Sequence, residues 1–239
     1  MYQNIDDMNI YYKVEGNGKD LILLHGWGLN LETFNKLNDD LKYEYKVYRI
    51  DLPGFGKSVI NKPLSILEVT DVLHKFINKM KIENPILIGH SYGGRIGIVY
   101  SSMYSVDKLV LISTPGIKHK LNWDKRVRIR LYKVFKRLGI NLNIGSNDYK
   151  NSSDINKKML VKTVNHDLTV YMNSIECPTL LLYGRNDKIT SVSLGMNINK
   201  EIKSSTLIVL DDCGHFPYIE RFNYFILVLK SYLGDNHAC

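Results

Sequence analysis

The chain has 239 residues, of which 44% are hydrophobic and 23% are charged, and its net charge is +8. This composition is ordinary for a soluble globular protein of one α/β domain. No apolar run approaches the roughly 20 residues that cross a bilayer. The polar stretch 1–9 lacks the features of a signal peptide. Three scattered cysteines argue against a disulfide framework or a zinc cluster, so we expect a reducing, cytoplasmic location.

The first part of the chain alternates between strand and helix patterns. Residues 10–14 alternate apolar and polar side chains, which is typical of an outer antiparallel strand. The continuous apolar run 21–24 predicts a buried strand. A short helix is expected at 31–41 behind the N-cap Asn30, and another strand at 45–50.

The same alternation continues to the end of the chain. Ser65 and Glu68 form a predicted capping box, which opens an amphipathic helix that ends near Met80. Continuous apolar strands between amphipathic helices predict an α/β fold, with a mostly parallel sheet covered by helices on both faces. The later strands are expected at 85–88, 108–112, 178–183 and 206–210, and a closing helix at 216–232.

The stretch Gly89-His90-Ser91-Tyr92-Gly93 joins a predicted strand directly to a helical pattern. So abrupt a turn strains the backbone of Ser91, and the glycines on either side remove Cβ atoms that would clash across the bend. The serine hydroxyl is thereby expected to stand above the end of the strand, at the positive end of the next helix. This is a favourable place for a nucleophile.

An acid and a histidine follow two later strands. Asp187 comes shortly after the strand 178–183, and His215 shortly after the strand 206–210. Parallel strands end at one edge of the sheet, so we expect both side chains to lie near Ser91. This order predicts a catalytic triad, in which His215 takes the serine proton and Asp187 orients the imidazole. Asp211 and Asp212 are alternative acids, although they lie very close to His215 in sequence.

Together these motifs resemble those of the α/β-hydrolase-fold superfamily, in particular its lidded serine esterases and lipases. Carboxylesterases and pimeloyl-carrier-protein methyl ester esterases are similar members. The resemblance implies an oxyanion hole built from the backbone N–H groups of Trp27 and Tyr92, and a reaction without cofactor or metal. A serine at position 91, where some relatives have aspartate, argues against dehalogenase or epoxide hydrolase activity. The matching stretches are 25–28, 51–58, 89–94, 183–187 and 214–217.

Residues 116–166 interrupt the alternation and correspond by position to a helical lid. The hydrolase core would then comprise residues 1–115 and 167–239. The insertion holds thirteen basic residues against three acidic ones, so it carries more than the whole positive excess of the chain. Apolar residues between these charges suggest an amphipathic helix that could cover the cleft. The charges are either a solvated basic face or a surface that attracts an anionic substrate.

We therefore expect a serine hydrolase that cleaves a carboxylic ester or thioester of a small to medium acyl group. Its substrate could be anionic or carrier-bound, such as an acyl-carrier protein or a coenzyme A ester; nucleic acid is not expected. His25 is expected to brace its loop, and His25, Arg95 and Trp123 are candidate substrate contacts. Arg95 also leaves open a pyruvate-eliminating synthase of the menaquinone pathway. A non-catalytic hydrolase-fold receptor is the other alternative, and oligomeric state stays open.

Overall fold

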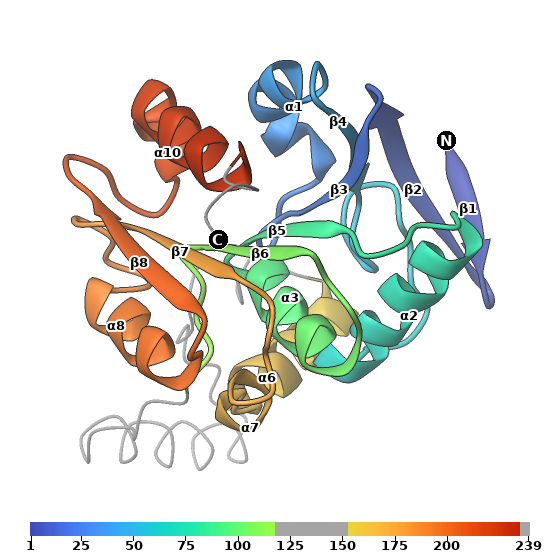
Figure 1. Cartoon of the computed structure of the whole chain (residues 1–239). Helices are drawn as coiled ribbons and strands as arrows, with labels where there is room; N and C mark the ends of the chain where they lie inside the picture. The colour runs from blue at the N-terminus through green and yellow to red at the C-terminus, as the bar shows by residue number, and fades with distance from the viewer. Residues whose placement is uncertain (118–152, 235–239) are drawn as a thin grey trace, which may run out of the picture.

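A twisted sheet of eight strands runs through the centre of the computed structural model, which describes residues 1–117 and 153–234 (Figure 1). The strand order is β1-β2-β4-β3-β5-β6-β7-β8. The pairs β1–β2 and β2–β4 are antiparallel, and all the other pairs are parallel. The strands are β1 Tyr2–Ile5, β2 Met8–Glu15, β3 Lys19–Leu24, β4 Tyr45–Ile50, β5 Ile86–His90, β6 Lys108–Ile112, β7 Thr179–Gly184 and β8 Ser205–Leu210.

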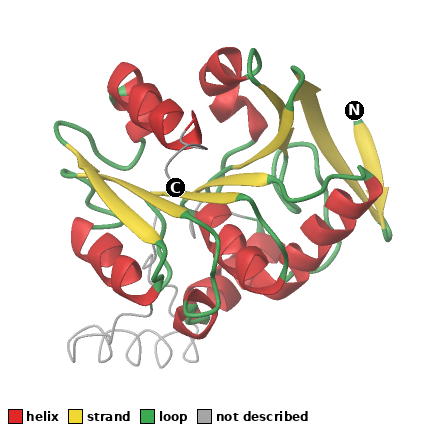
Figure 2. Ribbon diagram, in the orientation of Figure 1, coloured by secondary structure: helices red, strands yellow, loops and turns green. Residues whose placement is uncertain are grey.

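Helices cover both faces of this sheet, as Figure 2 shows. One face packs against η1 (Leu31–Phe34), α1 (Asn35–Leu41), α9 (Pro217–Glu220) and α10 (Phe222–Gly234). The opposite face packs against α2 (Ile66–Lys79), α3 (Tyr92–Met103), α7 (Thr169–Met172) and α8 (Val192–Glu201). Helix α6 (Asp154–Asn165) adds Met159 to the core on this side. The predicted α/β architecture, a mostly parallel sheet between two helical layers, is confirmed.

The central strands are apolar on both faces because both faces are buried. In β3, Leu21 and Leu23 belong to the core beneath α1 and α10. Their neighbours Ile22 and Leu24 belong to the core beneath α2 and α3. Successive side chains of a strand point to opposite faces, so a strand covered on both sides needs an unbroken apolar run.

Local signals in the sequence placed several elements well. Ser65 and Glu68 form the predicted capping box, with Glu68 N bonded to Ser65 Oγ at 3.3 Å and Ser65 N to Glu68 Oε2 at 2.7 Å. The helix expected at 31–41 begins as a 3-10 turn, and Asn30 caps it. The closing helix, expected to be continuous, is divided into α9 and α10 at Arg221, whose backbone leaves the helical region. Strand β1 and helix α8 were not predicted.

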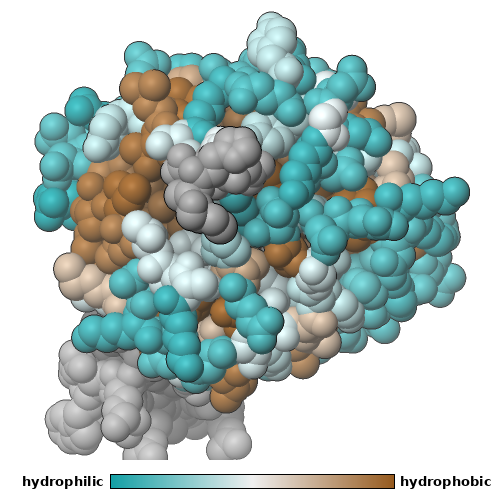
Figure 3. Space-filling model, viewed as in Figure 1, coloured by the Kyte–Doolittle hydropathy of each residue, from teal (hydrophilic) through white to brown (hydrophobic). Residues whose placement is uncertain are grey.

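The surface is mixed in polarity, with an apolar patch on the side where β8 lies (Figure 3). There β8 forms one edge of the sheet, and its residues Leu207, Ile208 and Val209 are half-buried. Among the described residues, no helix is both long enough and apolar enough to cross a membrane.

Candidate active site

Ser91 occupies the turn between β5 and α3 in a strained conformation, with φ 50° and ψ −106°. A positive φ is unusual for any residue with a side chain, and such strain is concentrated at functional sites. The flanking glycines make the turn feasible, as predicted. A Cβ on Gly93 would lie 2.1 Å from the carbonyl oxygen of Leu24, and a Cβ on Gly89 would lie 2.6 Å from the backbone of Gly93.

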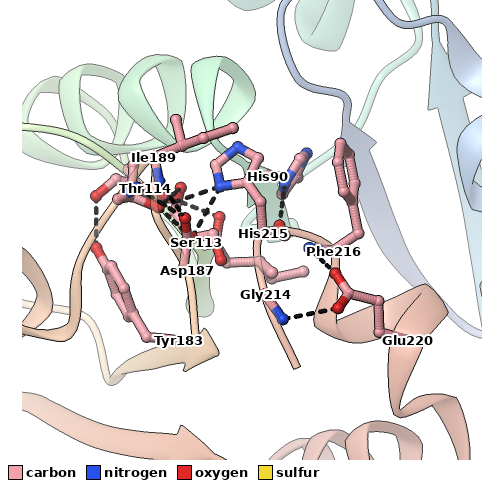
Figure 4. Close-up of polar contacts among 12 residues, drawn as sticks. His90, Ser113, Thr114, Tyr183, Asp187, Ile189, Gly214, His215, Phe216 and Glu220 are labelled. Atoms are coloured by element: carbon pink, nitrogen blue, oxygen red, sulfur yellow. Dashed lines mark hydrogen bonds and ion pairs between the residues drawn. The ribbon is translucent and has the colours of Figure 1, made fainter. Parts of the chain in front are cut away.

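Asp187 and His215 form a buried pair at the ends of β7 and β8 (Figure 4). His215 Nδ1 lies 2.8 Å from Asp187 Oδ2. The second carboxylate oxygen accepts backbone N–H groups from Ile189 at 2.7 Å and Thr190 at 2.8 Å, and the Thr190 hydroxyl donates to Oδ2 at 2.5 Å. Burial opposes ionisation of Asp187, but the hydrogen bonds from His215 and Thr190 outweigh it and lower its pKa to about 2. Asp187 is therefore an anion that can orient an imidazole.

The loop that carries His215 is held from behind. His90 Nε2 donates to the carbonyl oxygen of His215 at 2.9 Å. Glu220 accepts the N–H groups of Gly214 at 2.7 Å and Phe216 at 3.0 Å, one on each side of His215. Burial, assisted by the neighbouring His215, lowers the pKa of His90 to about 3, so His90 is neutral and acts as a fixed donor. These bonds fix the backbone of the histidine without using its ring.

The three predicted triad residues lie at the same carboxyl edge of the sheet. The rings of His215 and His90 are 4.8 Å apart, and His90 directly precedes Ser91 at the end of β5. Within residues 1–117 and 153–234, Nδ1 of His215 is hydrogen-bonded, whereas neither its Nε2 nor the Ser91 hydroxyl has a hydrogen-bond partner. The contact between serine and histidine thus stays a prediction; such bonds often tighten only when substrate binds.

The two residues predicted for the oxyanion hole are neighbours. Tyr92 is the first residue of α3, and the first N–H groups of a helix have no acceptor inside the helix. Trp27 lies in the loop after β3, and its ring is 5.1 Å from the ring of Tyr92. Both loops therefore meet beside Ser91, which is where donors to a developing oxyanion would be needed.

His25 and Arg95, the other predicted substrate contacts in the described range, are buried and bonded to the backbone. His25 Nδ1 donates to the carbonyl of Gly26 at 2.8 Å, and Nε2 accepts the N–H of Leu52 at 3.0 Å. Burial lowers the pKa of His25 to about 4, which suits the predicted bracing role. Within the described ranges, the two terminal nitrogens of Arg95 donate to main-chain carbonyls, and its Nε is buried without a partner. Trp123 lies outside the described residues, as does most of the predicted lid.

Three residues of the site were missed by the sequence analysis: Thr190, His90 and Glu220. An Asx turn joins Asp187 to the N–H of Ile189, two positions on, whereas the Thr190 hydroxyl is one position beyond that pattern. His90 and Glu220 act only through the three-dimensional packing of loops. Of the alternative acids, Asp211 pairs with Arg185 at the surface. No three His, Cys, Asp or Glu side chains within the described ranges are grouped so that they could hold a metal ion.

Comparisons with known proteins agree with this geometry. Residues 20–140 match the family model described as alpha/beta hydrolase fold. The pimeloyl-[acyl-carrier protein] methyl ester esterase of Wigglesworthia glossinidia brevipalpis is 27% identical and aligns over 93% of this chain and 97% of its own length. That of Vibrio campbellii is 22% identical over 94% and 98%.

Solved structures show the same fold. A bacterial membrane phospholipase A superposes with a TM-score of 0.83 at 23% identity, covering 100% of this chain and 86% of its own. The esterase of Exiguobacterium antarcticum superposes with a TM-score of 0.81 at 21% identity, covering 98% of both chains. The family model spans half of the chain, and the strained serine, the buried acid–histidine pair and the strand order all agree with it. The chain belongs to the alpha/beta hydrolase fold family.

Proposed function

We propose that this protein hydrolyses a carboxylic ester or thioester of a small to medium acyl group, with Ser91, Asp187 and His215 as its catalytic triad. The observation that carries the proposal is the strained Ser91 at the start of α3, at the same sheet edge as the buried Asp187–His215 pair. A family fold alone does not specify chemistry, whereas these three groups at one edge do.

The reaction proceeds in two halves. His215 Nε2 accepts the hydroxyl proton as Ser91 Oγ attacks the carbonyl carbon, and the same proton passes to the departing alkoxide or thiolate. A water molecule then attacks the acyl-enzyme as His215 takes one of its protons. The bond between the acyl carbon and Ser91 Oγ breaks, Ser91 Oγ receives that proton from His215, and the acid leaves. The negatively charged Asp187 stabilises the imidazolium in both halves. The N–H groups of Trp27 and Tyr92 stabilise the oxyanion, and losing one such donor costs about 10²–10³ in rate.

An aromatic cluster beside Ser91 is suited to the acyl chain. The ring of Phe55 lies 4.8 Å from that of Trp27 and 5.8 Å from that of Tyr92. Phe55 and Tyr92 are buried and Trp27 is half-buried, so among the described residues Trp27 presents the more exposed part of a cluster that favours an apolar chain. The relatives that act on pimeloyl-[acyl-carrier protein] methyl ester support an acyl chain of medium length, delivered on a carrier, as the class to test first.

The alternative of a pyruvate-eliminating synthase has lost its main support. It rested on Arg95 as a contact for a multiply carboxylated substrate, and the three carbonyls that Arg95 binds leave its charge facing the protein backbone. A non-catalytic receptor has no need of an ionised Asp187 held by four donors. Ester hydrolysis is therefore the activity to test first.

The direct test replaces the nucleophile. Ser91→Ala is expected to lower kcat/KM for p-nitrophenyl butyrate at least about 10³-fold, because the hydroxyl that forms the acyl-enzyme is gone. The matched control is Ser193→Ala, which removes an exposed hydroxyl at the start of α8 and should hydrolyse the ester at the wild-type rate. Equal turnover by wild type and Ser91→Ala would reject the assignment.

A further inference from the structure

Helix α6 lies along the carboxyl edge of the sheet and is bonded to the core at both of its ends. Near its start, Asn156 Nδ2 donates to the carbonyl of Gly54, in the loop after β4, at 2.9 Å. Near its end, the carbonyls of Thr163 and His166 accept from Arg95. Thr163, near the end of α6, is bonded to Arg95 in the first turns of α3. The helix therefore passes the start of α3, where Ser91 lies.

Of these two attachments, the one through Arg95 has more hydrogen bonds. Its guanidinium donates to Thr163 O at 2.7 Å, to His166 O at 2.6 Å and to Pro115 O at 3.3 Å. Arg95 is only 6% exposed. Burial lowers its pKa to about 10, which still leaves it charged at neutral pH. The Thr163 carbonyl also accepts the N–H of His166 at 3.1 Å, and a charged donor adds a stronger hydrogen bond to it than a neutral one would.

The chemistry of α6 explains why a cation suits this place. The last carbonyls of a helix lack N–H donors inside the helix and carry the negative end of its dipole. Arg95 supplies both donors and positive charge to them from a different helix. Pro115 lies just before the segment 116–166 and His166 at its end, so one side chain joins the two points where this segment leaves and rejoins the core. The backbone bond from Leu168 N to Gly116 O, at 3.0 Å, closes the same base.

Arg95 also lies one turn from a residue of the proposed oxyanion hole. Tyr92 precedes it by three positions on α3, so the two side chains share one side of the helix. The Tyr92 phenol is buried near the Thr163 side chain of α6. Its ring contacts Trp27 and Phe55, which we propose as the acyl wall. A shift of α6 would thus be felt first by the groups that contact the acyl chain.

We propose that Arg95 is a positioning residue that fixes α6 against the nucleophile helix and thereby sets the shape of the acyl end of the site. The inference rests on the proposed esterase function. It assigns to Arg95 no contact with substrate. The residue acts through Thr163, His166 and Tyr92.

The test compares Arg95→Met and Arg95→Lys with wild type. Arg95→Met should speed amide hydrogen exchange in residues 154–166 at least about tenfold and leave exchange in β5 and β7 unchanged. It should raise KM for p-nitrophenyl butyrate several-fold more than KM for the acetate, with a smaller change in kcat. Arg95→Lys keeps the charge and some of the donors, so both effects should be intermediate. Lys162→Met, which removes one exposed hydrogen bond from α6 to Pro63, is the control and should match wild type.

Wild-type exchange in 154–166 of Arg95→Met would overturn the inference. So would faster exchange with an unchanged KM ratio, or a loss confined to kcat, which would indicate a direct catalytic role. If Arg95→Met does not fold, the same comparison is made with Arg95→Lys. If the wild-type protein hydrolyses no ester, the proposed function is wrong. The exchange experiment would still decide whether Arg95 holds α6 in place.

Discussion

The carboxylate of Asp187 is buried away from water, and donors of the protein take the place of water around it. Its side chain is fully buried, yet Ile189, Thr190 and His215 surround its oxygens with donors. Thr190 Oγ1 also lies 3.1 Å from the carbonyl oxygen of Ser113, just after β6, which is a second acceptor for its single hydroxyl proton. This arrangement keeps the acid ionised and fixes the face of the imidazole that it meets.

This residue should leave a signature in the acid stability of the protein. The pKa of Asp187 in the folded protein is about 2, below its ordinary value of 3.8. A lowered pKa contributes stability that is complete above pH 4 and is lost as the pH falls towards 2, because the unfolded chain then binds the proton more readily. The urea midpoint of wild type should therefore fall more steeply between pH 4 and pH 2 than that of Asp187→Asn. Parallel curves for the two proteins would contradict the assigned shift.

At the level of residues, the sequence predicted the side chains whose place in the fold follows from their order along the chain. Ser91, Asp187 and His215 could be predicted because each follows the end of a strand, and parallel strands end at one edge. His90 and Glu220 could not, since their partners are backbone groups 125 and up to 6 positions away that only the folded loops bring close. Arg95 was interpreted as a substrate contact because the sequence gives its charge but not the carbonyl groups that it binds in the folded protein.

At the scale of elements, the junction of β5 and α3 depends on close backbone approach. Gly93 packs directly onto the end of β3, where no side chain can move aside. A Cβ on Gly97, one turn later on α3, would lie 3.1 Å from a methyl group of Leu109 and 3.7 Å from one of Leu111. A side chain at Gly93 would require the backbone to move, whereas one at Gly97 would require only a shift of neighbouring leucine side chains.

This contrast predicts different stabilities for two alanine variants. Gly93→Ala should lower the free energy of unfolding by at least about 2 kcal/mol, because its methyl group would overlap the Leu24 carbonyl. Gly97→Ala should change it by less than about 1 kcal/mol, since better helix propensity offsets a small shift of Leu109. Urea denaturation of both variants measures the difference. Similar losses in the two would show that the backbone approach at Gly93 is not the constraint.

Predictions of elements succeeded where local chemistry decides and failed where tertiary contact does. The capping box at Ser65 is a local signal and was recognised. The division between α9 and α10 is not, because apolar residues lie on both sides of Arg221, and Tyr218 and Phe222 both pack into the core. The helix expected within 118–152 lies outside the described residues, so that prediction is untested.

At the scale of the whole molecule, positive charge is distributed unevenly along the chain. Residues 116–166 carry thirteen basic side chains, whereas the rest of the chain is slightly acidic. In the described part of this segment, Lys158 and Lys162 are exposed on α6, the helix that is bonded to the rim of the site. Charge gathered near a site attracts ligands of opposite sign and raises their association rate.

Salt should therefore separate anionic from neutral substrates. Between about 0.01 M and 1 M salt the Debye length falls from about 30 Å to about 3 Å. Over that range kcat/KM for a methyl ester that bears a free carboxylate should fall about tenfold, and that for p-nitrophenyl butyrate by less than twofold. Lys158→Glu should flatten the response, and Lys203→Glu, the same charge change outside the segment, should not. An equal response of both esters would favour a merely solvated basic face.

The central claim is that Ser91 is the nucleophile of a working triad, and a fluorophosphonate probe tests it most directly. The probe forms a covalent bond only with an activated serine. We predict that the intact protein gains the mass of one phosphonyl group, that peptide mapping places it on Ser91, and that Ser91→Ala gains none. An unlabelled wild-type protein, or a label on any other residue, would contradict the account.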